Sequence, residues 1–260
     1  ALDIDPAEPL AHAVLARVAA AEDHRQNAVA EAQEALIAGS EDGLALSGVA
    51  WTYGVLGDWE EAVRYSEQAV SREPNHPGLR LQLAEAYREE ERYRDAMDAA
   101  TEALALDQGW ETKAHASLGH TLRRQEKYSE AMAEFREALA LDPDNDHAAW
   151  GLGACLFRQE SYEEALPHLE RAVDVVPNNA NYQNWLGVCY YRLENYEDAL
   201  PHLERAVEED SSDADFLCWE AWCYYKLSRY DEARAEVTAA LELDPDVEDG
   251  QELVDKLDVL

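Results

Sequence analysis

Cysteine is the residue of this sequence whose spacing first suggests chemistry, because thiols bind metals and take part in redox reactions. Cys155, Cys189 and Cys223 are 34 residues apart, in a slot where a small hydrophobic side chain suits packing between helices. Side chains one such step apart are too distant to form a disulfide easily. Cys218 and Cys223 are five apart on one predicted helix, which is poor zinc geometry. We therefore expect no metal and no redox role for these thiols.

Two other residue patterns resemble metal-binding sites, but neither has the full set of ligands. The segment DPDNDHAAWGLG (142–153) begins like a calcium loop, but His147 stands where the loop needs glycine and Gly153 where it needs a bidentate glutamate. His168 and His202 recur one step apart beside prolines, and we expect them on a solvated surface. The sequence contains no HExxH, GxSxG or GxGxxG motif and no phosphate-cradling glycine loop. We therefore predict that the protein is not an enzyme and that it needs no cofactor.

The charge of the chain argues against two classes of partner. The 260 residues include 21 Lys+Arg and 56 Asp+Glu, a formal net charge of −35. Such a surface repels phosphate backbones and anionic lipids, so we expect neither nucleic acid nor a membrane as partner. No apolar run approaches the ~18 residues of a membrane span. Residues 1–10 lack the basic start of a secretory signal, and we expect a cytoplasmic protein.

Lysine is scarce among the basic residues, with only Lys113, Lys127, Lys226 and Lys256. High acidity with few lysines fits a protein that works in high salt, and an arginine excess fits a GC-rich coding sequence equally well. In either case self-repulsion at this charge should destabilise the fold in dilute buffer, and salt should screen it.

A 34-residue repeat organises the chain. Four sets of similar residues keep this step in one register, interrupted by a single inserted residue near Trp110, and such a period indicates tandem structural repeats. The sets are Pro6, Ser40, Pro74, Gln108, Pro143, Pro177, Ser211 and Pro245; Ala28, Ala62, Ala96, Ala131, Ala165, Ala199 and Ala233; Ala35, Ala69, Ala103, Ala138, Ala172, Ala206 and Ala240; and the rings Trp59, Tyr93, Tyr128, Tyr162, Tyr196 and Tyr230.

Each repeat is predicted to form two helices. In residues 180–213, Leu186, Gly187 and Tyr190 share one helical stripe, and Leu203 belongs to a second stripe after a short turn. Small residues let the two helices approach closely, and the rings fill the space between them. A lone helix pair cannot bury its apolar face, whereas stacked pairs can. The sequence therefore predicts an all-α fold, an α-solenoid.

These repeats resemble the tetratricopeptide repeat (TPR) family over residues 9–247. The segments 128–143 and 162–177 match the second half of its motif closely. The resemblance implies a right-handed superhelix of helix-turn-helix repeats and a protein-interaction scaffold. The sequence departs from the pattern at Arg25, in place of the ring, and at Glu220, where other repeats carry Leu or Val. Within one repeat the matching residues are Leu152, Gly153, Tyr162, Ala165, Leu169, Ala172 and Pro177.

The register also predicts where the segments of the chain begin and end. Residues 1–8 resemble the tail of a preceding repeat, so we expect the natural protein to extend N-terminally. Residues 248–260 are predicted to form a C-terminal capping helix, because a terminal repeat must cover its apolar surface. The seven repeats between them are 9–42, 43–76, 77–111, 112–145, 146–179, 180–213 and 214–247.

In the TPR family the free face of the first helices lines a concave groove that binds peptide segments. We assign this face by helical spacing, and in the last four repeats it is rich in basic and aromatic side chains. Tyr, Trp and Arg carry most binding energy at interfaces, and two asparagines can bond a peptide backbone. The predicted peptide-binding residues are Lys113, His120, Arg123, Arg124, Trp150, Phe157, Arg158, Asn181, Asn184, Tyr191, Arg192, Trp222, Tyr225 and Lys226.

This face predicts a non-catalytic protein–protein interaction scaffold that binds an acidic or carboxylate-ended peptide of a partner protein. Three alternatives remain. The basic residues can simply offset acidic flanks through weak local pairs. The protein can also self-associate into a structural oligomer, or serve as a regulatory module of a larger protein. The Lys/Asn/Asn/Lys/Arg clamp with which some co-chaperones of the family hold a terminal carboxylate has no match over three successive repeats here.

Overall fold

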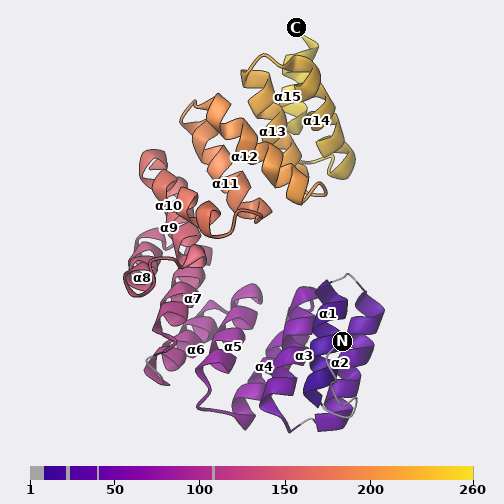
Figure 1. Cartoon of the computed structure of the whole chain (residues 1–260), viewed down its shortest axis with the longest axis vertical. Helices are drawn as coiled ribbons and strands as arrows, with labels where there is room; N and C mark the ends of the chain where they lie inside the picture. Colours follow the sequence, from indigo (N-terminus) through magenta and orange to yellow (C-terminus); the bar gives the residue numbers. More distant parts are fainter. Residues whose placement is uncertain (1–8, 22–23, 40, 107–108, 260) are drawn as a thin grey trace. The chain divides into compact units, whose positions relative to one another are not determined.

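The chain is helical throughout the part that the structure describes. The computed structural model describes residues 9–21, 24–39, 41–106 and 109–259, and these form 15 α-helices and no strand, as Figure 1 shows. This confirms the prediction of an all-α solenoid. The expected tail of a preceding repeat, residues 1–8, lies outside the described residues. None of the described helices has both the length and the apolarity that crossing a membrane requires.

The chain divides into two compact units, and the N-terminal unit is Ala1–Leu141. Its helices are α1 (Pro9–Ala21), α2 (Arg25–Gly39), α3 (Gly43–Val55), α4 (Trp59–Arg72), α5 (Pro77–Glu89), α6 (Tyr93–Leu106), α7 (Glu111–Arg124) and α8 (Tyr128–Leu141). Each first helix packs on the second helix of its repeat, and α1, α3, α5 and α7 also contact one another in succession. The first helices are therefore neighbours along one side of the unit.

The C-terminal unit is Asp142–Leu260. Its helices are α9 (Asp146–Arg158), α10 (Tyr162–Val175), α11 (Ala180–Arg192), α12 (Tyr196–Glu209), α13 (Ala214–Lys226), α14 (Tyr230–Leu243) and α15 (Gly250–Asp258). The first helices α9, α11 and α13 again contact one another in succession. The last helix, α15, packs on α14 and buries Leu253 and Leu257.

Side-chain caps start the first helices of this unit. Asn145 accepts a hydrogen bond from the Ala148 backbone N–H at 2.8 Å, and Asn179 accepts one from the Tyr182 N–H at 3.1 Å. Asp213 does the same for α13. These bonds satisfy backbone donors that have no partner within the helix, so the sequence defines where each first helix begins.

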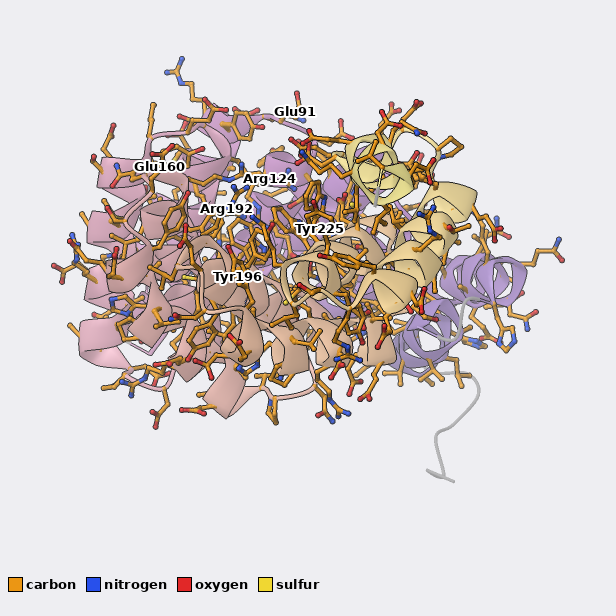
Figure 2. All side chains as sticks on the ribbon, turned by 90° about the horizontal axis from the view of Figure 1, so that it is seen from above. Glu91, Arg124, Glu160, Arg192, Tyr196 and Tyr225 are labelled. Carbon is orange, nitrogen blue, oxygen red and sulfur yellow. The ribbon has the colours of Figure 1, made fainter. Side chains whose placement is uncertain are left out.

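The turn between the two helices of a repeat requires one residue in the left-handed backbone region. In α3–α4 this residue is Gly57, with φ 76°, and glycine adopts this region without steric cost. The later turns place a side chain there, including Glu91 and Glu160 in Figure 2, and each pays a steric penalty. These residues are Glu91, Glu126, Glu160, Glu194 and Ser228, with φ between 58° and 63°.

Glycine in the first helix sets how closely the second helix approaches. A Cβ atom at Gly153 would lie 2.8 Å from the Leu169 side chain, and one at Gly187 would lie 2.7 Å from Leu203. Both leucines are completely buried. A large side chain on one helix therefore fills the space that glycine leaves on the other, as close packing demands.

Glu220 is the exception in the core of the C-terminal unit. It occupies the position of Leu152 and Leu186, and it is only 5% exposed. Burial raises the pKa of its carboxyl group to about 7, because desolvation disfavours the charged form. Its Oε2 atom has no hydrogen-bond partner. The last repeat therefore packs like its neighbours but encloses an acid.

Candidate functional site

The basic residues of the C-terminal unit fall into two groups. Three of its eight Lys and Arg, namely Arg158, Arg192 and Lys226, form no ion pair within residues 142–259. The remaining five pair with carboxylates: Arg171 with Asp144, Arg205 with Glu208 and Glu209, Arg229 with Glu232, Arg234 with Asp258, and Lys256 with Glu252.

The three cations without ion pairs lie near aromatic rings instead. The guanidinium carbon of Arg158 is 5.6 Å from the centre of the Trp185 ring, and that of Arg192 is 5.1 Å from the centre of Trp219. The Lys226 ammonium is 5.6 Å from the centre of the Tyr196 ring. A cation within about 6 Å of a ring centre is attracted by the negative ring face. All three side chains remain exposed, so their outer sides are open to a ligand.

A second ring precedes each cation and joins these contacts into a row. Phe157 lies 5.0 Å from Tyr162 and 5.2 Å from Trp185, centre to centre, with steep interplanar angles. In the next repeat the ring centre of Tyr191 lies 5.2 Å from that of Tyr196 and 5.6 Å from that of Trp219. Arg192, Tyr196 and Tyr225 are labelled in Figure 2. We call this set the aromatic–cation ladder: Phe157, Arg158, Trp185, Tyr191, Arg192, Trp219, Tyr225 and Lys226.

The repeat itself positions the ladder. Arg158, Arg192 and Lys226 are the last residues of α9, α11 and α13, where a positive charge also interacts favourably with the helix dipole. Each tryptophan comes from the next first helix along the chain, which packs against the previous one. The rings are half-buried, and burial raises the pKa of the Tyr191 hydroxyl. The ladder thus offers apolar ring surface edged by positive charge.

Most of the predicted residues of the C-terminal unit lie on or beside this ladder. Trp150 stacks on Tyr182 at 5.9 Å and meets Trp185 edge-on at 6.1 Å. Trp222 lies 5.8 Å from Tyr225. The two predicted asparagines lie on α11: Asn181 is exposed, whereas Asn184 is half-buried and its Oδ1 has no hydrogen-bond partner.

Sequence reasoning missed two members of the ladder. Trp185 and Trp219 were absent from the predicted set, although each contacts a cation and an aromatic ring of the preceding repeat. A usable signal was present in the sequence, because the two tryptophans are 34 residues apart and hold the same repeat position.

In the N-terminal unit the predicted basic residue Arg124 is exposed but, unlike the three cations of the ladder, it forms an ion pair. Its guanidinium forms an ion pair with Glu89 of the preceding repeat. Arg88 lies 3.1 Å from the same glutamate and 3.8 Å from Glu85. This part of the predicted face is therefore internally neutralised, as expected for ordinary repeat chemistry.

The other three predicted residues of this unit lie on α7. The Lys113 ammonium is 4.6 Å from the centre of the Trp110 ring. His120 packs edge-on against the buried Phe135 of α8 at 4.9 Å. Arg123 is half-buried. Of these three, only Lys113 has an exposed side chain.

The cysteines are buried and His202 is half-buried. All four cysteines are buried, and burial raises the pKa of Cys189, Cys218 and Cys223 to about 12. His202 is not the solvated side chain that we expected, because its ring stacks on Tyr190 at 5.7 Å. Across the described residues, no group of three or more His, Cys, Asp or Glu side chains could hold a metal ion.

Comparison with known proteins identifies the repeat. Models of the tetratricopeptide repeat match residues 56–119, 117–180, 156–214 and 190–248. No curated protein matches the chain.

Solved structures share the fold at low sequence identity. A chain of the APC/C hetero-tetramer Cut9–Hcn1 aligns with TM-score 0.78 and 17% identity, covering 99% of this chain and 49% of that chain. PilF of Pseudomonas aeruginosa aligns with TM-score 0.70 and 19% identity over 84% and 98% of the two chains. The pilus biogenesis factor PilW aligns with TM-score 0.68 and 21% identity, covering 82% of this chain and 98% of that chain. The chain thus spans about half the length of the first structure.

Proposed function

Because the chain belongs to the tetratricopeptide repeat family, whose repeats form protein–protein interaction scaffolds, we propose that it is a non-catalytic scaffold that binds a peptide segment of a partner protein. The segment lies on the first helices of the repeats. In the C-terminal unit its binding surface is the aromatic–cation ladder, and its recognised chemistry is a carboxylate next to an apolar or aromatic anchor.

One observation carries this proposal. In a chain with a net charge of −35, carboxylates are abundant, and the other five basic residues of the C-terminal unit each pair with one. Arg158, Arg192 and Lys226 contact rings instead. If these cations served only to offset acidic flanks, they would pair in the same way as the others.

The ladder has the composition of an interface core. Aromatic side chains and arginine are enriched where binding energy is concentrated, and half-buried rings lose little conformational freedom when a partner covers them. Arginine presents its fork of N–H donors to a carboxylate while one face stays on a ring. The ladder therefore suits a ligand that brings negative charge and apolar contact together.

A charge-reversal experiment with a matched control tests the proposal. Peptides selected from a random-sequence display library on the wild-type protein provide the probe. We expect the selected peptides to carry Asp, Glu or a free C-terminal carboxylate. The triple variant Arg158→Glu/Arg192→Glu/Lys226→Glu should bind them at least about 10-fold more weakly.

The control variant Arg171→Glu/Arg205→Glu/Arg234→Glu changes the net charge by the same amount but alters only residues outside the ladder. It should keep the wild-type affinity to within about threefold, because exposed ion pairs contribute little. Circular dichroism establishes that both variants are folded. Equal weakening in the two variants, or unchanged binding in the first, would overturn the proposal.

A further inference from the structure

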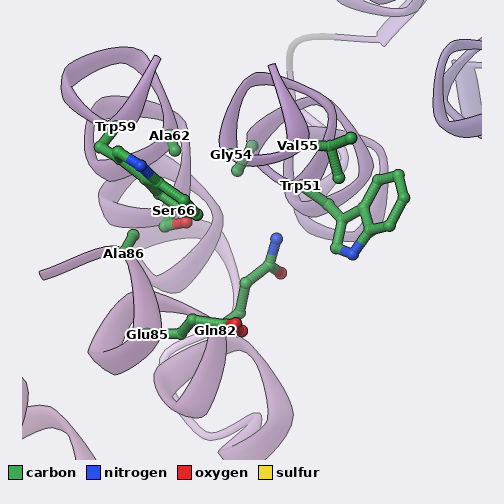
Figure 3. Close-up of a pocket in the computed structure, with 10 residues that line it drawn as sticks. Trp51, Gly54, Val55, Trp59, Ala62, Ser66, Gln82, Glu85 and Ala86 are labelled. Atoms are coloured by element: carbon green, nitrogen blue, oxygen red, sulfur yellow. The ribbon is translucent and has the colours of Figure 1, made fainter. Parts of the chain in front are cut away.

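A cavity of about 270 Å³ lies within the N-terminal unit, between α3, α4 and α5. Figure 3 shows Trp59 and Ser66 of α4 on one side of this space, Trp51 and Val55 of α3 on the other, and Gln82 of α5 below. None of these residues belongs to the aromatic–cation ladder. The lining residues are Ala50, Trp51, Gly54, Val55, Trp59, Ala62, Ser66, Gln82, Glu85 and Ala86.

The repeat register explains why this space is empty. Gly54 occupies the position that Phe157, Tyr191 and Tyr225 hold in the C-terminal unit, five residues before the conserved ring position of each repeat. Gln82 occupies the position of Trp185 and Trp219. Two rings that fill this site in the C-terminal unit are therefore missing, while the third ring, Trp59 at the position of Tyr162, is retained.

A third replacement deepens the cavity and leaves a polar atom in it. Ser66 stands where the repeats of the C-terminal unit have Leu169, Leu203 and Val237. It is only 1% exposed, and its hydroxyl has no hydrogen-bond partner. Gln82 does not supply one; its amide instead donates to the Ser47 carbonyl at 2.7 Å and accepts from the Ser47 hydroxyl. A buried hydroxyl without a partner costs free energy unless a ligand satisfies it.

We propose that this cavity is a receptor slot for a tyrosine side chain of a partner polypeptide. The chain itself shows how the ring would lie, since Phe157 packs edge-on against Tyr162 at 5.0 Å and Tyr191 against Tyr196 at 5.2 Å. A ligand ring would take the same place against Trp59. Its phenol group would meet the Ser66 hydroxyl once this side chain rotates toward the cavity, and the hydroxyl can donate or accept.

The rim of the slot differs in charge from the ladder. Val55 replaces the cation of the later repeats and is 47% exposed, and Glu85 adds an exposed carboxylate. Because Arg88 already lies 3.8 Å from the Glu85 carboxylate, the slot favours an uncharged context around the tyrosine. The inference assumes, with the proposed function, that the partner is a polypeptide, but it rests on different residues.

The direct probe is p-cresol, which is the tyrosine side chain alone, with toluene as the analogue that lacks the hydroxyl. Titration is followed by the indole N–H resonances of Trp51 and Trp59 in NMR spectra of the full chain. We expect p-cresol to shift these two signals with saturation on the order of 1 mM. Toluene should bind roughly 2- to 10-fold more weakly, because the Ser66 hydroxyl then stays unsatisfied.

Two variants distinguish binding in the slot from nonspecific binding elsewhere on the protein. Gly54→Phe/Trp59→Tyr recreates the Phe157–Tyr162 pair and should abolish binding of both probes. The second substitution is needed because a Cβ at Gly54 would lie 2.8 Å from Trp59. The variant Ser66→Val copies the last repeat, in which Ala221 and Val237 hold the positions of Ala50 and Ser66. It should remove the preference for p-cresol over toluene.

Several outcomes would overturn the inference. They are p-cresol shifts that persist in a folded Gly54→Phe/Trp59→Tyr protein, an unchanged p-cresol preference in Ser66→Val, or no shift in the wild-type protein. A wild-type dimer that Gly54→Phe/Trp59→Tyr dissociates would assign the slot to a second copy of the chain instead. Loss of acidic-peptide binding by the ladder variant bears only on the proposed function, so the two ideas fail separately.

Discussion

The guanidinium of Arg192 lies 5.1 Å from the centre of the Trp219 ring, one repeat further along the chain. The same relationship holds between Arg158 and Trp185, so it is a property of the repeat rather than of one side chain. It links consecutive first helices and holds a positive charge at the surface without the help of a carboxylate.

This contact should contribute measurably to stability. A double-mutant cycle of Arg192→Gln and Trp219→Leu is expected to give a coupling energy of about 0.5–1 kcal/mol, the usual size for an exposed cation–π pair. Urea unfolding measures it. The control cycle pairs Trp219→Leu with Arg205→Gln, whose ion pairs lie elsewhere. Coupling of equal size in both cycles would contradict a specific contact.

Glu220 should make the stability of the C-terminal unit depend on pH. The pKa of this carboxyl is raised from 4.5 to about 7 in the folded state, so its stabilising contribution is complete below pH 4.5 and is lost as pH rises through 7. The ionisable groups around it are Tyr224, Glu236, Glu204 and Arg229.

The variant Glu220→Gln cannot ionise and tests this linkage. Relative to wild type, its free energy of unfolding should rise between pH 4.5 and 8 by up to about 3 kcal/mol. Chemical denaturation across this pH range measures the gap. For the control Glu164→Gln, at an exposed position of α10, the difference in free energy of unfolding from wild type should hardly change with pH. A pH-independent difference for Glu220→Gln would refute the raised pKa of Glu220.

The left-handed turn residues should tolerate glycine better than the residues present. Glu126 has φ 59° between α7 and α8, and Glu126→Gly should raise the free energy of unfolding by about 0.5–1 kcal/mol, because glycine relieves the steric cost. Glu137→Gly removes the same charge from the middle of α8 and should lower it by about 1 kcal/mol. Effects of the same sign would show that charge, not backbone conformation, dominates.

The buried cysteines should be almost inert in the folded protein. With pKa values of about 12 for Cys189, Cys218 and Cys223, the thiolate fraction at pH 8 is roughly 1000-fold below that of a free thiol. A thiol reagent should therefore label the native chain very slowly and label all four cysteines in urea. Rapid native labelling would contradict the packing around these thiols.

Salt should stabilise the fold strongly. At a net charge of −35, self-repulsion opposes the compact state, and the Debye length falls to about 3 Å at ~1 M salt. The melting temperature should rise by at least about 5 °C between ~0.05 and ~1 M NaCl. Chloride is preferred to sulfate, because sulfate also strengthens apolar burial. A flat response would mean that the acidity has little energetic effect.

The sequence by itself determined the repeat architecture. The 34-residue ladders of alanine and of rings are packing requirements of neighbouring helices, so they are visible in one dimension as a period. The pairing of Gly153 with Leu169 follows from the same logic, because a small residue on one helix must face a large one on the other. The aromatic and basic composition of the first helices was also evident from spacing alone.

Only the tertiary structure decided which of these residues act together. Arg124 and Arg158 hold the same repeat position, yet Arg124 pairs with Glu89 and Arg158 lies over Trp185. Likewise, the empty space beside Trp59 results from three replacements spread over three helices. Charge pairing and cavity formation depend on the side chains of adjacent repeats in contact, and a period in the sequence does not reveal that combination.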